Sequence, residues 1–156
     1  MIQRHSSTPV QDLVPPIKDC GATSAADWIS REGSLECLIG YMDLIWRDFV
    51  LHDGCLLPAG FDPENYDAWL QATKGDRTSV EAVMNHIHIL DIFPEQRDEP
   101  TRAQVFVVGR VLREMWTAKL SHAYPKLSVT VSFRDDQEFD DLLEYEITVY
   151  QNRPKH

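Results

Sequence analysis

The chain has 156 residues, of which 43% are hydrophobic and 26% charged, and this size and composition are typical of one globular domain. The net charge of −10 and the lack of a basic patch in the sequence exclude nucleic acid as an expected partner, because a binder displaces counterions with Lys and Arg. No apolar stretch approaches the roughly 18 residues that a membrane span needs, and no signal peptide is recognisable. We therefore expect a cytoplasmic protein that does not bind a membrane.

The acidity is concentrated in one segment. Residues 135–146 hold seven acidic residues and neither Lys nor Arg, whereas the rest of the chain carries 18 acidic and 15 basic residues. This segment lacks the glycine and the ligand spacing of an EF-hand loop, so a solvated loop is favoured over a Ca²⁺ site. The three cysteines (Cys20, Cys37 and Cys55) lack the spacing of metal ligands and are expected to be free thiols.

The N-terminal third is predicted to be irregular at first and then helical. Residues 1–19 contain three prolines and no sustained hydrophobic period, so we expect an irregular arm there and a single globular domain over 20–152. A short helix is predicted over 25–32. A longer helix is predicted between the N-cap Ser34 and the terminating Gly54, because apolar residues recur there at spacings of three and four. Its predicted apolar stripe consists of Leu35, Leu38, Ile39, Met42, Ile45, Trp46 and Phe49.

Three further helices are predicted in the middle of the chain. Asp62, followed by a proline, is a typical start for a helix over 63–73. Thr78 and Glu81 have the spacing of a capping box and start a helix over 79–93. Apolar residues cover most of the circumference of that helix, so we expect it to be the most buried element. A long helix over 101–122 follows.

The hydrophobic period changes from helical spacing to two near the C-terminus. This alternation predicts two half-buried strands over 127–134 and 142–150, joined by the acidic loop into an antiparallel hairpin. The predicted fold is α+β, with about five helices packed around the buried helix 79–93 and the hairpin covering one side. No third strand is convincing, so both edges of the hairpin are expected to be unpaired and open to a protein partner or a second copy.

The predicted helix 79–93 carries the candidate site residues. Glu81, Asn85 and His88 fall on one polar stripe of an otherwise apolar helix. Two interpretations stay open. The three side chains could form a buried structural network, or they could line a pocket in which His88 acts as acid and base and Glu81 orients it, with His52 contributing.

A metal site is not expected. On a helix His86 and His88 point about 200° apart and cannot share an ion. On a strand both would face one side, but zinc also needs a third protein ligand, and none is evident nearby in the sequence. No cofactor is expected either, since the chain has no Walker loop, G-x-G-x-x-G, G-x-S-x-G or H-E-x-x-H motif.

The missing catalytic motifs favour a small, non-catalytic interaction or regulatory domain that acts through its C-terminal hairpin, with a homodimer as one form of that interaction. The alternative is a small enzyme or ligand-binding domain with a pocket lined by Glu81, Asn85 and His88. Cys55 lies close to His52 in the sequence, but this spacing has no specificity for a Cys–His nucleophile, and a small buried side chain is the simpler interpretation.

Overall fold

The computed structural model describes residue 13, residues 25–92 and residues 99–154 of the chain. These residues form five α-helices and five β-strands, and the strands make two small antiparallel sheets. The predicted α+β class is therefore confirmed. The arm predicted over 1–19 lies outside the described residues except for Leu13, and the single domain over 20–152 stays a prediction.

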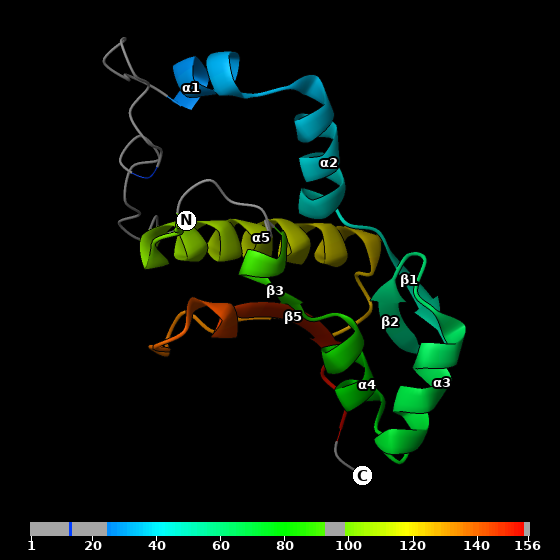
Figure 1. The fold of residues 1–156 in the computed structure, drawn as a ribbon. Coiled ribbons are helices and arrows are strands. Elements are labelled where there is room, and N and C mark those ends of the chain that lie inside the picture. The colour runs from blue at the N-terminus through cyan, green and yellow to red at the C-terminus, as the bar shows by residue number, and fades with distance from the viewer. Residues whose placement is uncertain (1–12, 14–24, 93–98, 155–156) are drawn as a thin grey trace.

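The long helix α5 (Arg102–Ala123) forms the centre of the core and agrees closely with the predicted helix 101–122. It lies across the molecule, with the larger sheet on one side and α1 and α2 on the other (Figure 1). A capping box formed by Thr101 and Gln104 starts it. One face is buried along the whole length, and its buried residues are Val105, Gly109, Leu112, Trp116 and Leu120. The core therefore surrounds α5, whereas we expected it to surround the predicted helix 79–93.

The larger sheet contains the predicted C-terminal hairpin, but the strand predicted over 142–150 starts only at Glu146, because Leu142–Glu144 form a 3-10 helix that Asp141 caps. Strands β4 (Val129–Phe133) and β5 (Glu146–Gln151) are antiparallel, and alternate residues of β5 are buried as the sequence predicts. A third strand, β3 (Ile87–His88), pairs with the other side of β5, so the strand order is β3–β5–β4. The expectation of two unpaired edges is therefore wrong on the β5 side, which β3 covers.

The helix predicted over 79–93 is shorter than expected. Helix α4 (Arg77–Met84) stops there, and the chain continues as the strand β3 and the 3-10 helix η2 (Ile89–Ile92). The helical prediction fails because the pairing of this segment with β5 outweighs its local spacing. Ile87 lies directly opposite Ile147, where both side chains join the core.

The second predicted helix also ends early. Helix α2 (Leu35–Ile45) is followed by a two-stranded sheet of β1 (Phe49–His52) and β2 (Cys55–Pro58). Asp53 and Gly54 form the turn between these strands with φ values of 48° and 75°. A two-residue hairpin turn requires this left-handed conformation, and Gly adopts it at no steric cost. Gly54 therefore turns a hairpin instead of ending a helix.

Two further helices agree with the sequence prediction. They are α1 (Ala25–Glu32) and α3 (Pro63–Ala72). The predicted caps Ser34 and Asp62 each accept a backbone N–H from the first turn of α2 and α3, at 3.1 and 2.9 Å respectively. None of the described helices is both long and apolar enough to cross a membrane.

Candidate functional site

The carboxylate of Glu81 lies in the core, where α4 meets β2 and β5. Its side chain is completely buried. Oε1 accepts the backbone N–H of Leu56 at 2.6 Å, and Oε2 accepts the backbone N–H of Gln151 at 2.8 Å. The side-chain amide of Gln151 donates to Oε1 as well, at 2.6 Å. One carboxylate thus connects three elements that are far apart in the sequence.

Arg153 completes the coordination of Glu81. Its two terminal nitrogens donate to Oε2 and Oε1, both at 2.8 Å, in the bidentate geometry typical of Arg–carboxylate pairs. This hydrogen bonding raises the pKa of the Arg153 guanidinium above its usual range. Arg153 also donates to the carbonyl oxygen of Gly54 at 2.8 Å. Both carboxylate oxygens of Glu81 are therefore engaged by donors of the protein itself.

Asn85 extends the same network from the end of α4. Its Nδ2 donates to the carbonyl oxygens of Leu56 and Val149, both at 2.8 Å, while its buried Oδ1 has no partner among the described residues. Glu81 and Asn85 thus form the structural arrangement that was one of the two interpretations of the sequence. They hold α4 against β2 and β5.

His52 lies apart from this network, on β1. Its ring packs against the rings of Phe61 and Tyr66, with centroid distances of 4.9 Å to each. Cys55 is buried beside them, with Sγ 3.8 Å from the Tyr66 hydroxyl. Burial raises the pKa of the Cys55 thiol, which disfavours the reactive thiolate. This cluster therefore has the character of a small packed core.

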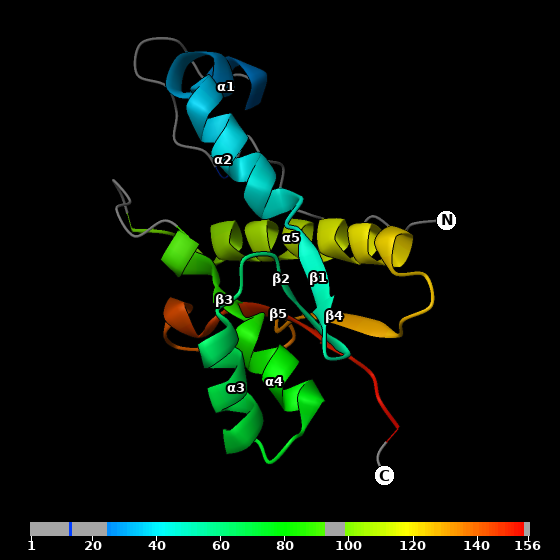
Figure 2. The same ribbon diagram turned by 90° about the vertical axis from the view of Figure 1, so that its right-hand side faces the viewer.

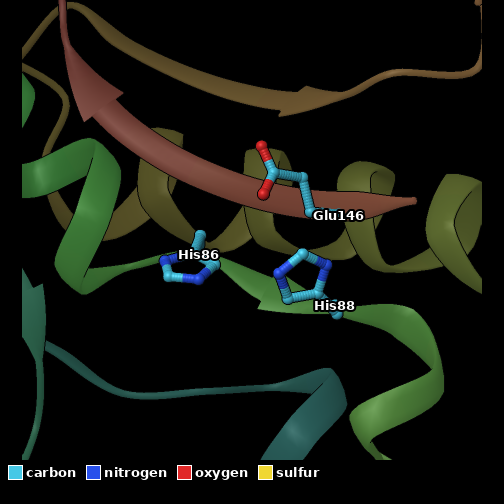
Figure 3. A group of neighbouring side chains, drawn as sticks. All are labelled: His86, His88 and Glu146. Atoms are coloured by element: carbon cyan, nitrogen blue, oxygen red, sulfur yellow. The ribbon is translucent and has the colours of Figure 1, made fainter. Parts of the chain in front are cut away.

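His88 is not part of the Glu81 and Asn85 network, because the segment that carries it is a strand. On β3 it lies directly opposite Glu146 of β5, and His86 lies two residues earlier, directly before β3. One nitrogen of each ring and one carboxylate oxygen of Glu146 all lie within 4.8 Å of one another. Figure 3 shows the three side chains gathered where β3 meets β5.

The predicted 200° divergence of the two histidines is therefore wrong, since it assumed a helix. The sequence does contain the relevant signal, because H-x-H alternation on a strand places both rings on one side. Glu146 could not be found in the same way. Its position beside them follows from the register of β3 on β5, which local sequence does not specify.

Among the described residues, the most exposed apolar surface lies on α2 and its C-cap Trp46. We call Leu35, Leu38, Ile39, Met42 and Trp46 the α2 stripe, and the exposed fractions of its side chains range from 49% to 68%. No residue of α2 is buried. The helix is attached at its last turn, where the carbonyl oxygen of Leu44 accepts the indole N–H of Trp116 at 2.9 Å. In Figure 2, α1 and α2 project from α5 away from both sheets.

Comparison with known proteins gives no match: no family model, no curated protein and no solved structure is significantly similar to this chain.

Proposed function

We propose that this protein is a non-catalytic interaction domain that self-associates through the α2 stripe. The observation that carries the proposal is the exposure of all five stripe residues, four on α2 and one at its C-cap Trp46, while α2 itself contains no buried residue. Contiguous exposed apolar surface of this kind typically marks a protein interaction site, whereas singly scattered apolar residues do not.

The orientation of α2 supports this proposal. At about 100° per residue, Leu35, Leu38, Ile39 and Met42 fall within an arc of about 100°. Leu44 and Ile45 pack against the core at the last turn; Leu44 lies on the opposite side of the helix from Leu35, and Ile45 lies at the edge of the arc beside Leu38. The helix therefore meets its own domain at its last turn, while Leu35, Leu38, Ile39 and Met42 stay exposed along the rest of its length.

The charge pattern favours a second copy as the partner. The stripe contains no charged residue, and the charges of α2, Glu36 and Asp43, lie together on one flank. An uncharged apolar face meets an identical face without like-charge repulsion, and a twofold interface uses the same patch on both copies. Because α1 and α2 project from α5 (Figure 2), two copies could pair along α2 with their sheets far apart.

The expected affinity is modest. Burying the exposed part of one such side chain contributes roughly 1 kcal/mol, so two stripes together contribute about 10 kcal/mol. Association costs an estimated 4–15 kcal/mol in lost freedom. A reversible dimer that dissociates in the micromolar range or above is consistent with these magnitudes, and an obligate dimer is not.

The outer edge of β4 is a second candidate surface. Among the described strands, β4 pairs with β5 alone, so its other edge resembles the hairpin edge expected from the sequence. Unpaired edges favour the addition of a strand from another chain. The groove between β4 and α5 measures only about 50 Å³, well below the 300–1,000 Å³ typical of small-molecule sites, so it does not suit a small-molecule ligand.

Sedimentation velocity of the purified chain tests the proposal. We expect a concentration-dependent dimer in the wild type, and we expect Leu38→Glu to abolish it because a charge would enter the apolar interface. Val111→Glu is the matched control, since Val111 is also an exposed apolar residue on a helix but lies on α5 outside the stripe. A wild type that is monomeric at every concentration contradicts self-association. A dimer that survives Leu38→Glu contradicts the role of α2 and points to the β4 edge.

A further inference from the structure

We propose that His86, His88 and Glu146 form a binding site for one divalent transition-metal ion of the zinc type. Ligand atoms of the three residues lie within 4.8 Å of one another; His88 and Glu146 are on the paired strands β3 and β5, and His86 directly precedes β3. Two imidazoles and one carboxylate form a ligand set that proteins use for zinc when a coordination position stays open. The site is independent of the α2 stripe and of any oligomeric state.

Hydrogen bonding prepares both rings as ligands. Nδ1 of His86 lies 2.5 Å from the carbonyl oxygen of Val83, and Nδ1 of His88 lies 2.6 Å from the carbonyl oxygen of Leu143. A carbonyl oxygen only accepts, so each Nδ1 must carry the hydrogen and donate it. The lone pair of each ring is then on Nε2. Metal-ligating histidines in proteins are held in this way by a second hydrogen bond that fixes the tautomer and the ring orientation.

The backbone also positions these rings. Leu143 belongs to the 3-10 helix η3 (Leu142–Glu144), directly before β5, and Val83 lies in the last turn of α4. The two carbonyl acceptors therefore come from the elements that flank the β3–β5 pair. The rings stand nearly perpendicular to each other, at 89° with centroids 5.3 Å apart, so both can direct a nitrogen towards one point without stacking.

Glu146 supplies the third ligand. It lies directly across the sheet from His88, where opposite side chains of an antiparallel pair come closest. It forms no ion pair with a basic side chain in the described parts of the chain. In Figure 3 the carboxylate and the two rings lie close together where the strands meet.

The three ligand atoms need to move only a short distance towards one another to bind one ion. Ligand atoms on a tetrahedral zinc ion lie about 3.3 Å apart, because the bonds are about 2.0–2.2 Å long. The ligand atoms lie at most 4.8 Å apart, so each distance must shorten by at most about 1.5 Å, and rotation of these partly exposed side chains can supply that movement. The two imidazole nitrogens select against Ca²⁺ and Mg²⁺, which prefer oxygen ligands. Three protein ligands leave a fourth position for water or another small ligand.

The test is a titration of the untagged, full-length chain, stripped of metal by a chelator, with Zn²⁺ and separately with Co²⁺ as an optical probe. We expect one ion per chain, and the visible absorption of Co²⁺ should indicate a site of low coordination number. Saturating Zn²⁺ should also raise the melting temperature by about 5–10 °C at a hundredfold excess over Kd, because the ion links β3 to β5. His86→Ala, His88→Ala and Glu146→Gln should each weaken binding at least about tenfold.

Two controls separate this site from general surface binding. His122 is an exposed histidine at the end of α5, and Glu144 is an exposed carboxylate two residues before Glu146. His122→Ala and Glu144→Gln should leave the affinity unchanged. Glu146→Gln retains the shape of the side chain, so it keeps the test valid if a histidine variant does not fold. Absence of stoichiometric binding, or binding that the controls weaken as much as the ligand variants do, overturns the proposal.

Discussion

Glu81→Gln should strongly destabilise the protein. Substitution replaces one carboxylate oxygen with an NH₂ group that faces donors only, because Leu56, Gln151 and Arg153 all donate to this carboxylate. Breaking a buried ion pair by removing one partner costs about 3–5 kcal/mol, since the other charge stays buried without compensation. Arg153 is partly exposed, and its access to water places the expected loss near the lower figure, about 3 kcal/mol.

Urea denaturation followed by circular dichroism measures this loss. For a chain of this size, about 3 kcal/mol corresponds to a fall in melting temperature of roughly 6–12 °C. Glu114→Gln is the matched control, because Glu114 is an exposed carboxylate on α5 and its substitution should change the free energy of unfolding by less than about 0.5 kcal/mol. If Glu81→Gln costs less than about 1 kcal/mol with an unchanged m-value, the network does not hold α4 to the sheets as described.

Further predictions concern helix packing and pH. Gly109→Ala should cost about 1–3 kcal/mol of stability, measured by thermal unfolding, because the new methyl group would lie 2.2 Å from the ring of Phe133. Gly40→Ala is the control: no atom lies within 4 Å of its new methyl group, so it should stabilise the protein by up to about 1 kcal/mol. Similar effects at both sites would contradict the packing of α5 on β4. Burial of the Asp135 carboxyl opposes ionisation, but hydrogen bonds from two arginines of α5 outweigh it and lower its pKa. A lowered pKa in the folded state stabilises at neutral pH, and this contribution is lost as pH falls through the folded-state pKa. Asp135→Asn should therefore reduce the free energy of unfolding by about 1–2 kcal/mol at pH 7, as measured by urea denaturation at each pH. This loss should shrink as pH falls below the ordinary Asp pKa of about 4, and a loss independent of pH contradicts this role.

Much of the helical structure was predictable because its signals are local. Ser34 and Asp62 start their helices as N-caps, and the prolines and polar residues that flank α5 define its length within a residue at each end. The alternation in the last third of the chain predicts the β4–β5 hairpin for the same reason. Each of these signals depends on residues that are neighbours in the sequence.

The errors arise where distant residues compete with local spacing. The helical period that begins at Leu35 continues through Phe49, but Asp53-Gly54 is itself a strong signal for a hairpin turn and decides the structure of this segment. The helical spacing continues up to Ile87, but Ile87 pairs with β5 and is part of a strand. No local sequence pattern indicates this pairing. Residues 93–98, assigned in part to the same helix, lie outside the described residues.

The candidate site shows the same limit. Glu81 and Asn85 were identified as buried polar residues because they interrupt an apolar helix, and both join the network at the centre of the fold. His88 was grouped with them on helical spacing and belongs instead with His86 and Glu146. The apolar stripe predicted from Leu35 to Phe49 divides in the structure, since Ile45 and Phe49 pack in the core and its other residues form the exposed α2 stripe. Spacing does not tell whether such a face meets its own core or another chain.

Amide hydrogen exchange of the wild type at low and high protein concentration tests the proposed role of α2 most directly. The account predicts that peptides covering residues 35–46 exchange more slowly at high concentration, while peptides from α3 and α4 exchange at the same rate in both conditions. Exchange in α2 that is equally fast at every concentration would contradict self-association through the α2 stripe.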